Sequence, residues 1–245
     1  MPYNPIQLWK VPTELLRTSL ILLAVALITV SSPAAGADSH QHPEPVVLAP
    51  GYAALEFHPP PAGSYELPPL GKAADGLITD SRGQRLSLHD LLDDKVVVLS
   101  FIYTSCSDVN GCPLASYVLK GISDRLADSA ELKQRVRLVS FSFDPDSDSP
   151  EVLAAYGDRL RGPDSDWRFV TSPSQSQLRS VLADYDQWVY PDYDARGNYL
   201  GTVSHLLRVY LIDTDKRIRN IYSVSFLHAD TLLNDIRTLL AEKKI

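Results

Sequence analysis

The feature that most constrains the fold is an apolar run at residues 96–103, which leads directly into a loop that holds both cysteines of the chain. A run without regular polar alternation predicts a strand that is buried on both faces, as in the middle of a parallel sheet. Pro113 follows Cys112 and opens a helical pattern over residues 113–128. Proline suits the first turn of a helix, where its missing N–H costs nothing, so Cys112 is the predicted N-cap. Cys106 and Cys112 are therefore predicted to lie at a turn from strand to helix.

The alternation of strands and helices continues along the chain. Further strands are predicted at residues 136–143 and 167–171, and further helices at 149–160 and 174–185. An antiparallel pair at 206–213 and 218–224 precedes a last helix at 229–243, and residues 76–88 predict a β-hairpin. Helices that connect strands of one sheet cover its faces. The sequence therefore predicts an α/β domain over residues 65–245. We expect a thioredoxin-like sandwich in which helices flank a central mixed sheet, with an N-terminal β-hairpin.

Residues 1–64 predict export and a linker. Lys10 and Arg17 precede an apolar stretch at 20–30, and small residues follow at 34–37. This is the layout of a signal peptide, residues 1–37, because the stretch is about half of the roughly 20 residues that cross a bilayer. Retention of residues 20–36 as an anchor is the alternative, and only then is membrane contact expected. Prolines concentrate in residues 38–64, which predicts an extended linker. We expect a periplasmic or otherwise exported protein.

Charge and cysteine count exclude several classes of function. A net charge of −7 argues against binding nucleic acid or an anionic membrane surface. With 2 cysteines the chain is not a scaffold held together by disulfides. In an oxidising compartment, a pair of thiols closes to a disulfide unless a reductant or a metal keeps it open. Cys106 and Cys112 can therefore form a redox couple or bind a soft metal as thiolates, and the two residues alone leave both interpretations open.

Three segments carry a more specific pattern: residues 98–106 with Cys112-Pro113-Leu114, then 139–150, then 204–213. In this order they resemble the Sco (SenC) family of copper-binding proteins, whose members mature the copper centre of cytochrome c oxidase. The resemblance implies that Cys106, Cys112 and His205 bind copper, as Cu(I) or Cu(II), which suits a donor set of two thiolates and one imidazole. It also implies a metallochaperone rather than an enzyme. The partner would be a copper or haem metalloenzyme such as cytochrome c oxidase.

The cysteine spacing departs from the usual pattern of this family. Three residues usually separate the cysteines, whereas residues 107–111 make five here. The longer loop still allows both sulfur atoms to reach one metal or each other. Copper affinity and redox potential therefore transfer less directly from the family than the fold does.

A thioredoxin-type reductase, which shares the fold, is the main alternative. It would use Cys106 and Cys112 as a redox disulfide that keeps the cysteines of a partner reduced. Such enzymes usually have two residues between the cysteines and a proline at the start of the facing strand. Here that strand is predicted to open with Ser204-His205-Leu206, which favours a metal ligand at this place. A purely structural disulfide is the third interpretation.

Two aspartates and three aromatic residues lie in loops near the predicted site. Asp144 is a candidate to tune the metal from outside its ligand shell, whereas Asp148 is predicted to form a turn and cap a helix. Trp188, Tyr190 and Tyr193 fall in a predicted loop at 187–203, where docking a partner and simple loop packing are equally good explanations.

The mature N-terminus predicts a second copper site. If cleavage follows Ala37, the new chain begins Asp38-Ser39-His40. A histidine at the third position lets the free amine, two backbone amides and the imidazole surround Cu(II) or Ni(II) in a square plane. His40 is therefore a speculative Cu(II) ligand.

Overall fold

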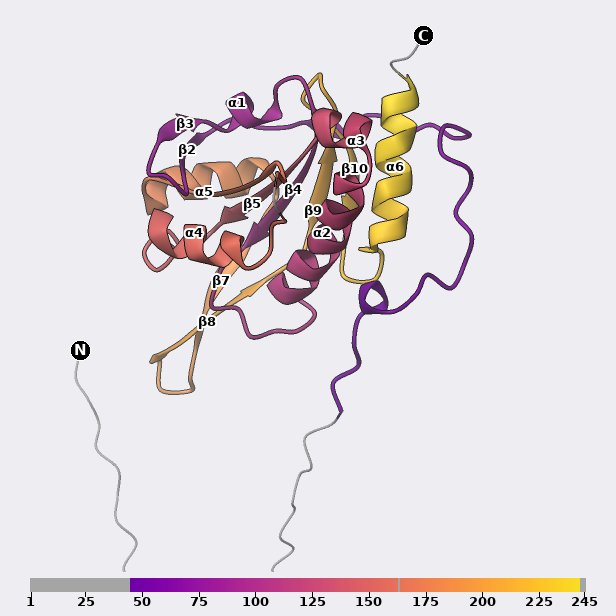
Figure 1. Ribbon diagram of the computed structural model, residues 1–245. Helices are drawn as coiled ribbons and strands as arrows, with labels where there is room; N and C mark the ends of the chain where they lie inside the picture. The colour runs from indigo at the N-terminus through magenta and orange to yellow at the C-terminus, as the bar shows by residue number, and fades with distance from the viewer. Residues whose placement is uncertain (1–44, 163, 243–245) are drawn as a thin grey trace, which may run out of the picture. The chain divides into compact units, whose positions relative to one another are not determined.

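The computed structural model describes residues 45–162 and 164–242 (Figure 1). The described residues from Val46 onward form one compact unit. The predicted signal peptide, His40 and the first residues of the predicted linker lie outside the described residues. Among the described helices, none combines the length and the apolar character that a membrane span requires.

The main sheet has eight strands in the order β1-β10-β9-β4-β5-β6-β2-β3. The central strands β4 (Val96–Ile102), β5 (Val136–Ser142) and β6 (Trp167–Thr171) run parallel. Antiparallel strands extend the sheet on both sides: β9 (Val209–Ile212), β10 (Arg217–Tyr222) and β1 (Gly71–Lys72) on one, and the hairpin of β2 (Leu77–Asp80) and β3 (Arg85–Ser87) on the other. The predicted thioredoxin-like mixed sheet and its N-terminal hairpin are thus confirmed.

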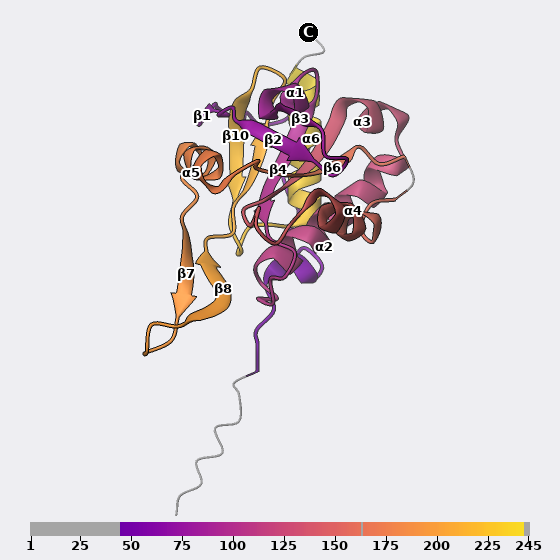
Figure 2. The same cartoon turned by 90° about the vertical axis from the view of Figure 1, so that its left-hand side faces the viewer.

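Helices cover both faces of this sheet (Figures 1 and 2). The helices α2 (Cys112–Ala127), α3 (Ala130–Arg135), α4 (Pro150–Asp158) and α6 (Ala229–Glu242) pack on one face. The helices α1 (Leu88–Leu92) and α5 (Gln175–Asp184) pack on the other. Strand β4 has apolar residues on both faces of the sheet: Val96 and Val98 belong to the first core cluster, and Val97 and Leu99 belong to the second. All seven residues of β4 are buried, as the apolar run predicted.

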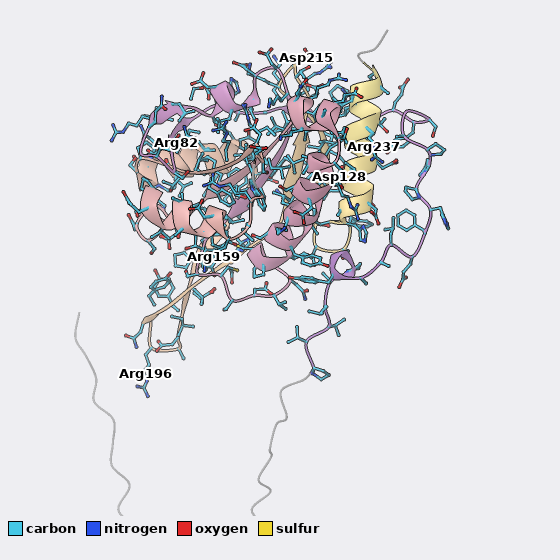
Figure 3. The ribbon with its side chains drawn as sticks, in the orientation of Figure 1. Arg82, Asp128, Arg159, Arg196, Asp215 and Arg237 are labelled. Atoms are coloured by element: carbon cyan, nitrogen blue, oxygen red, sulfur yellow. The ribbon has the colours of Figure 1, made fainter. Side chains whose placement is uncertain are left out.

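A separate two-stranded sheet corrects the prediction of a long loop at 187–203. The strands β7 (Val189–Tyr193) and β8 (Tyr199–His205) pair antiparallel and project from the body of the domain (Figure 2). The turn of this hairpin is built by the Asp194 carboxylate, which accepts from the backbone N–H groups of Arg196 and Asn198. Gly197 has a φ of 83°, a conformation that suits glycine. Arg196 lies at the tip of the projection (Figure 3).

Residues 49–52, which precede β1, lie against the domain. Ala49 belongs to the core cluster beneath α2, and the short 3₁₀ helix η1 (Pro50–Tyr52) follows it. This stretch falls within residues 38–64, for which the sequence predicts a linker. This stretch also forms hydrogen bonds with the loop that holds the cysteines.

Candidate metal centre

Cys106 and Cys112 lie at the connection between strand β4 and helix α2. Cys106 is partly exposed in the loop, and Cys112 is 1% exposed in the first turn of the helix. Gly111 is the N-cap, so the helix begins one residue earlier than predicted, and Cys112 is a helical residue rather than the cap. Both cysteines are free thiols. The position at a strand-to-helix turn is confirmed.

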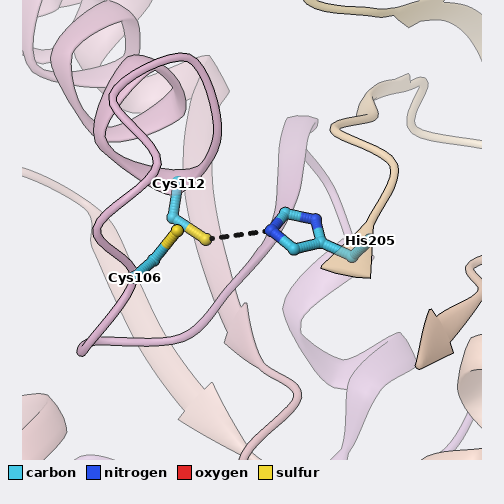
Figure 4. Close-up of side chains that lie close together, drawn as sticks. All are labelled: Cys106, Cys112 and His205. Atoms are coloured by element: carbon cyan, nitrogen blue, oxygen red, sulfur yellow. Dashed lines mark hydrogen bonds between the residues drawn. The ribbon is translucent and has the colours of Figure 1, made fainter. Parts of the chain in front are cut away.

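His205 reaches the sulfur atoms from the projecting hairpin. It is the last residue of β8, opposite Val189 of β7. Its ring packs against Phe143, with the ring centroids 4.9 Å apart, and lies edge-on to Tyr103. Its Nε2 atom is 3.6 Å from the Sγ atom of Cys112 (Figure 4). The structure therefore places the imidazole over the thiols from an element that is not part of the main sheet.

The ligand atoms of Cys106, Cys112 and His205 all lie within 4.8 Å of one another. Hydrogen bonds from the thiol of Cys112, from His205 and from the backbone N–H groups of Cys112 and Asp108 lower the pKa of Cys106. The hydrogen bond with the Cys106 thiolate and burial raise the pKa of Cys112. In the metal-free pair, these interactions therefore favour the thiolate at Cys106 and the thiol at Cys112.

The donor set fits a soft metal ion. Two sulfur atoms and one imidazole nitrogen are the ligands that suit Cu(I), and the same set also binds zinc or Cu(II). Binding would release the proton that Cys112 holds, because both sulfur ligands act as thiolates. The backbone N–H of Tyr103 also donates to the sulfur of Cys112, at 3.4 Å. This bond stabilises negative charge on the buried ligand.

Asp148 rather than Asp144 makes the polar contacts that shape the site. The carboxylate of Asp144 accepts from the backbone N–H of Ser147, in its own turn. Asp148 is 1% exposed and accepts from the hydroxyl of Ser142 at 2.5 Å and from the backbone N–H of Thr104 at 3.0 Å, as well as from the Thr104 hydroxyl. It thus holds the chain two residues before Cys106. A role for Asp144 in tuning the metal stays a prediction.

Sequence reasoning missed this role of Asp148. The sequence predicts Asp148 as the cap of this helix, but the cap is Ser149, whose hydroxyl accepts from the backbone N–H of Val152 at the start of α4. One sequence signal could have revealed this role, namely the position of Asp148 after a buried strand. Loops at the carboxyl ends of neighbouring parallel strands meet at one edge of the sheet.

Exposed aromatic residues flank His205. Trp188 and Tyr190 are 55% and 60% exposed, and their rings stack with centroids 6.5 Å apart. Leu206, also exposed, lines the same shallow depression with them and His205. These side chains are accessible from outside, as a docking surface requires, and the docking of a partner here stays a prediction.

Comparison with known proteins agrees with the fold. The model of the SCO1/SenC family matches residues 76–241. The SCO1 protein homolog of Bacillus subtilis (strain 168) is 24% identical over 158 residues, which is 64% of this chain and 76% of that protein.

Two solved structures extend the comparison. The SCO1/SenC family lipoprotein from Bacillus anthracis is 27% identical, with a TM-score of 0.59 over 72% of this chain and 99% of that chain. The ScoI of Arabidopsis thaliana, solved with copper bound, shares the fold at 20% identity, with a TM-score of 0.58 over 69% of this chain and 98% of that chain.

Proposed function

The chain belongs to the SCO1/SenC family, and from this premise we propose that it binds one copper ion through Cys106, Cys112 and His205 and delivers it to a partner metalloenzyme. The observation that carries the proposal is the convergence of two sulfur atoms and one imidazole nitrogen within 4.8 Å. The copper ion is the cargo of this protein. A respiratory oxidase, in particular the copper centre of cytochrome c oxidase, is the partner that we propose.

The different exposure of the ligands suits transfer. Three protein ligands leave a position open for a ligand of the acceptor, so copper can pass by stepwise exchange. Cys106 is partly exposed and lies in a loop, whereas Cys112 is buried in α2. We therefore infer that the acceptor replaces Cys106 early and Cys112 last. A proton returns to the Cys112 sulfur as the metal leaves.

Copper titration tests the proposal. The reduced protein is titrated with Cu(II) and monitored by the absorption of thiolate-to-copper charge transfer, and Cu(I) affinity is measured by competition with a chelator. Cys106→Ser and His205→Ala should weaken binding and change the spectrum. The exposed His58→Ala is the matched control and should leave both unchanged. Weak binding by the wild type, or spectra that these two site variants leave unaltered, would refute copper handling.

Reduction of a partner's disulfide is a second candidate function. A partly exposed Cys106 with a lowered pKa, beside a buried Cys112 thiol, has the arrangement of an attacking and a resolving thiol. The Cys106 thiolate would attack the partner disulfide, and Cys112 would then displace the reduced partner, leaving a Cys106–Cys112 disulfide. The partner gains the two electrons that the pair loses. The exchange rate with a partner dithiol and the reduction potential of the pair measure this activity.

Export is part of the proposal. We propose that residues 1–37 are a signal peptide, with anchoring by residues 20–36 as the alternative, and that the protein acts in the periplasm or an equivalent compartment. Mass spectrometry of the exported protein decides the cleavage site. A chain that starts anywhere other than Asp38 removes the N-terminal Cu(II) site that is predicted at His40.

A further inference from the structure

The loop between the cysteines is held by a segment that precedes the sheet. The side chain of Asn110 accepts a hydrogen bond from the backbone N–H of Ala49 at 2.8 Å and donates one to the carbonyl of Val47 at 2.9 Å. The hydroxyl of Tyr52 donates to the carbonyl of Val109 at 2.6 Å. Three hydrogen bonds therefore connect two consecutive loop residues to residues 47–52.

Within this segment, residues 49–52 are themselves fixed on the domain. Ala49 is 6% exposed within the core cluster beneath α2. Gly51 lies so close to the domain that a Cβ atom there would be 2.2 Å from the carbonyl oxygen of Leu227. The ring of Tyr52 packs on that of Tyr117 in α2, with centroids 4.9 Å apart. The segment is therefore a firm support for the loop.

The loop has little else to fix its middle. The Asp108 side chain accepts from the backbone N–H of Asn110, and the Asp108 carbonyl accepts from that of Gly111. These bonds shape a turn but lie within the loop itself. On the strand side, Asp148 holds Thr104. Because the freedom of a loop grows with its length, the bonds from residues 47–52 restrict how far the Cys106 sulfur can move from Cys112.

We propose that residues 47–52 form a clasp that positions the loop between the cysteines, with Asn110 and Tyr52 as the positioning residues. Its consequence for copper rests on the proposed function, because it concerns how tightly that site holds the ion. Its consequence for the Cys106 and Cys112 pair is independent of copper. The clasp lowers the free-energy cost of bringing the two sulfur atoms together, whether a metal or a covalent bond then joins them.

Full-length variants test the clasp. Tyr52→Phe removes one hydrogen bond and Asn110→Ala removes two, while Asn110→Asp keeps the acceptor and loses the donor. Since one net hydrogen bond corresponds to about fivefold in an equilibrium constant, release of Cu(I) to a chelator should become about fivefold faster in Tyr52→Phe and about 25-fold faster in Asn110→Ala. Asn110→Asp should fall between the wild type and Asn110→Ala. The Cu(II) charge-transfer band should shift in the same order.

The matched control is Tyr117→Phe, which removes a hydroxyl from the ring that packs on Tyr52 and leaves the bond to Val109 in place. It should release copper at the rate of the wild type. Tyr52→Phe is a mild change, so it keeps the test valid if Asn110→Ala folds poorly. Equal rates in wild type, Tyr52→Phe and Asn110→Ala, or equal effects of Tyr52→Phe and Tyr117→Phe, would overturn the clasp.

Equilibration of the metal-free pair with glutathione separates the clasp from the proposed function. Without the clasp, the loop is freer, so disulfide formation has to restrict it more. The equilibrium constant between disulfide and dithiol in Asn110→Ala should therefore shift about tenfold toward the dithiol. If the wild type binds no copper but this shift occurs, the proposed function fails and the clasp stands. If copper binds tightly and neither release nor the glutathione balance changes in the variants, the clasp fails and the function stands.

Discussion

Replacing Asp148 by alanine should destabilise the domain by about 3–4 kcal/mol. The change removes the acceptor of three hydrogen bonds, from the Ser142 hydroxyl, the Thr104 hydroxyl and the Thr104 backbone N–H. The hydroxyls can rotate toward other acceptors, at a cost of about 1 kcal/mol each. The backbone N–H cannot rotate, and leaving it partly buried without a partner costs about 1–2 kcal/mol. Asp148→Asn keeps one acceptor oxygen and should lose about half as much.

Urea unfolding of the reduced, metal-free protein measures this loss. Asp146→Ala is the control, because Asp146 is an exposed carboxylate in the same loop that pairs with Gln175. It should change the free energy of unfolding by about 0.5 kcal/mol or less. Copper release should also be faster in Asp148→Ala than in Asp146→Ala, since Thr104 leads to Cys106. A loss below about 1 kcal/mol for Asp148→Ala, or one no larger than that of the control, would refute the reasoning.

Three further predictions concern parts of the domain away from the sulfur atoms. Burial raises the pKa of Asp166, but hydrogen bonds from Lys95 and Arg168 outweigh it, so the native pKa lies below the usual value. The native state therefore binds this proton less readily than the unfolded chain. Its contribution is present above about pH 4 and is lost as the pH falls through the lowered native pKa. Asp166→Asn should thus lower the free energy of unfolding at pH 7, with a difference from the wild type that shrinks in acid. Gly157→Ala would place a Cβ atom 2.6 Å from the ring of Phe169. It should lower the free energy of unfolding by about 1–3 kcal/mol, which thermal unfolding measures. Tyr222→Phe removes a hydroxyl that donates to Asp235 at 2.5 Å and should cost about 1–2 kcal/mol in urea unfolding, although Asn220 and Tyr65 still donate to that carboxylate.

The elements with strong local patterns could be predicted from the sequence. The apolar run that becomes β4 has residues for both core clusters, and Pro113 marks the start of α2 to within one residue. The short helices α1 and α3 were missed, because five and six residues are too few to show a helical period. Local pattern therefore located Cys106 and Cys112 relative to a strand and a helix.

The hairpin that carries His205 could not be predicted in the same way. The sequence placed this histidine at the start of a strand in the main sheet, whereas β9 begins at Val209 and His205 ends β8. The hairpin has exposed residues on both faces, so it lacks the alternation that marks a half-buried strand.

The positions of the three proposed ligands thus depend on different kinds of interaction. Cys112 is fixed by a helix that packs on the sheet, and His205 by a paired strand and two aromatic rings. Cys106 has neither, and its place depends on polar contacts that Asp148 and Asn110 make over long sequence separations. Such contacts leave no periodic signal in a sequence, which is why both residues escaped prediction. For the same reason, Cys106 is the ligand that substitutions outside the donor set should displace most easily. The exchange of copper is therefore expected to be most sensitive at this loop, whereas changes in α2 should affect mainly the stability of the domain.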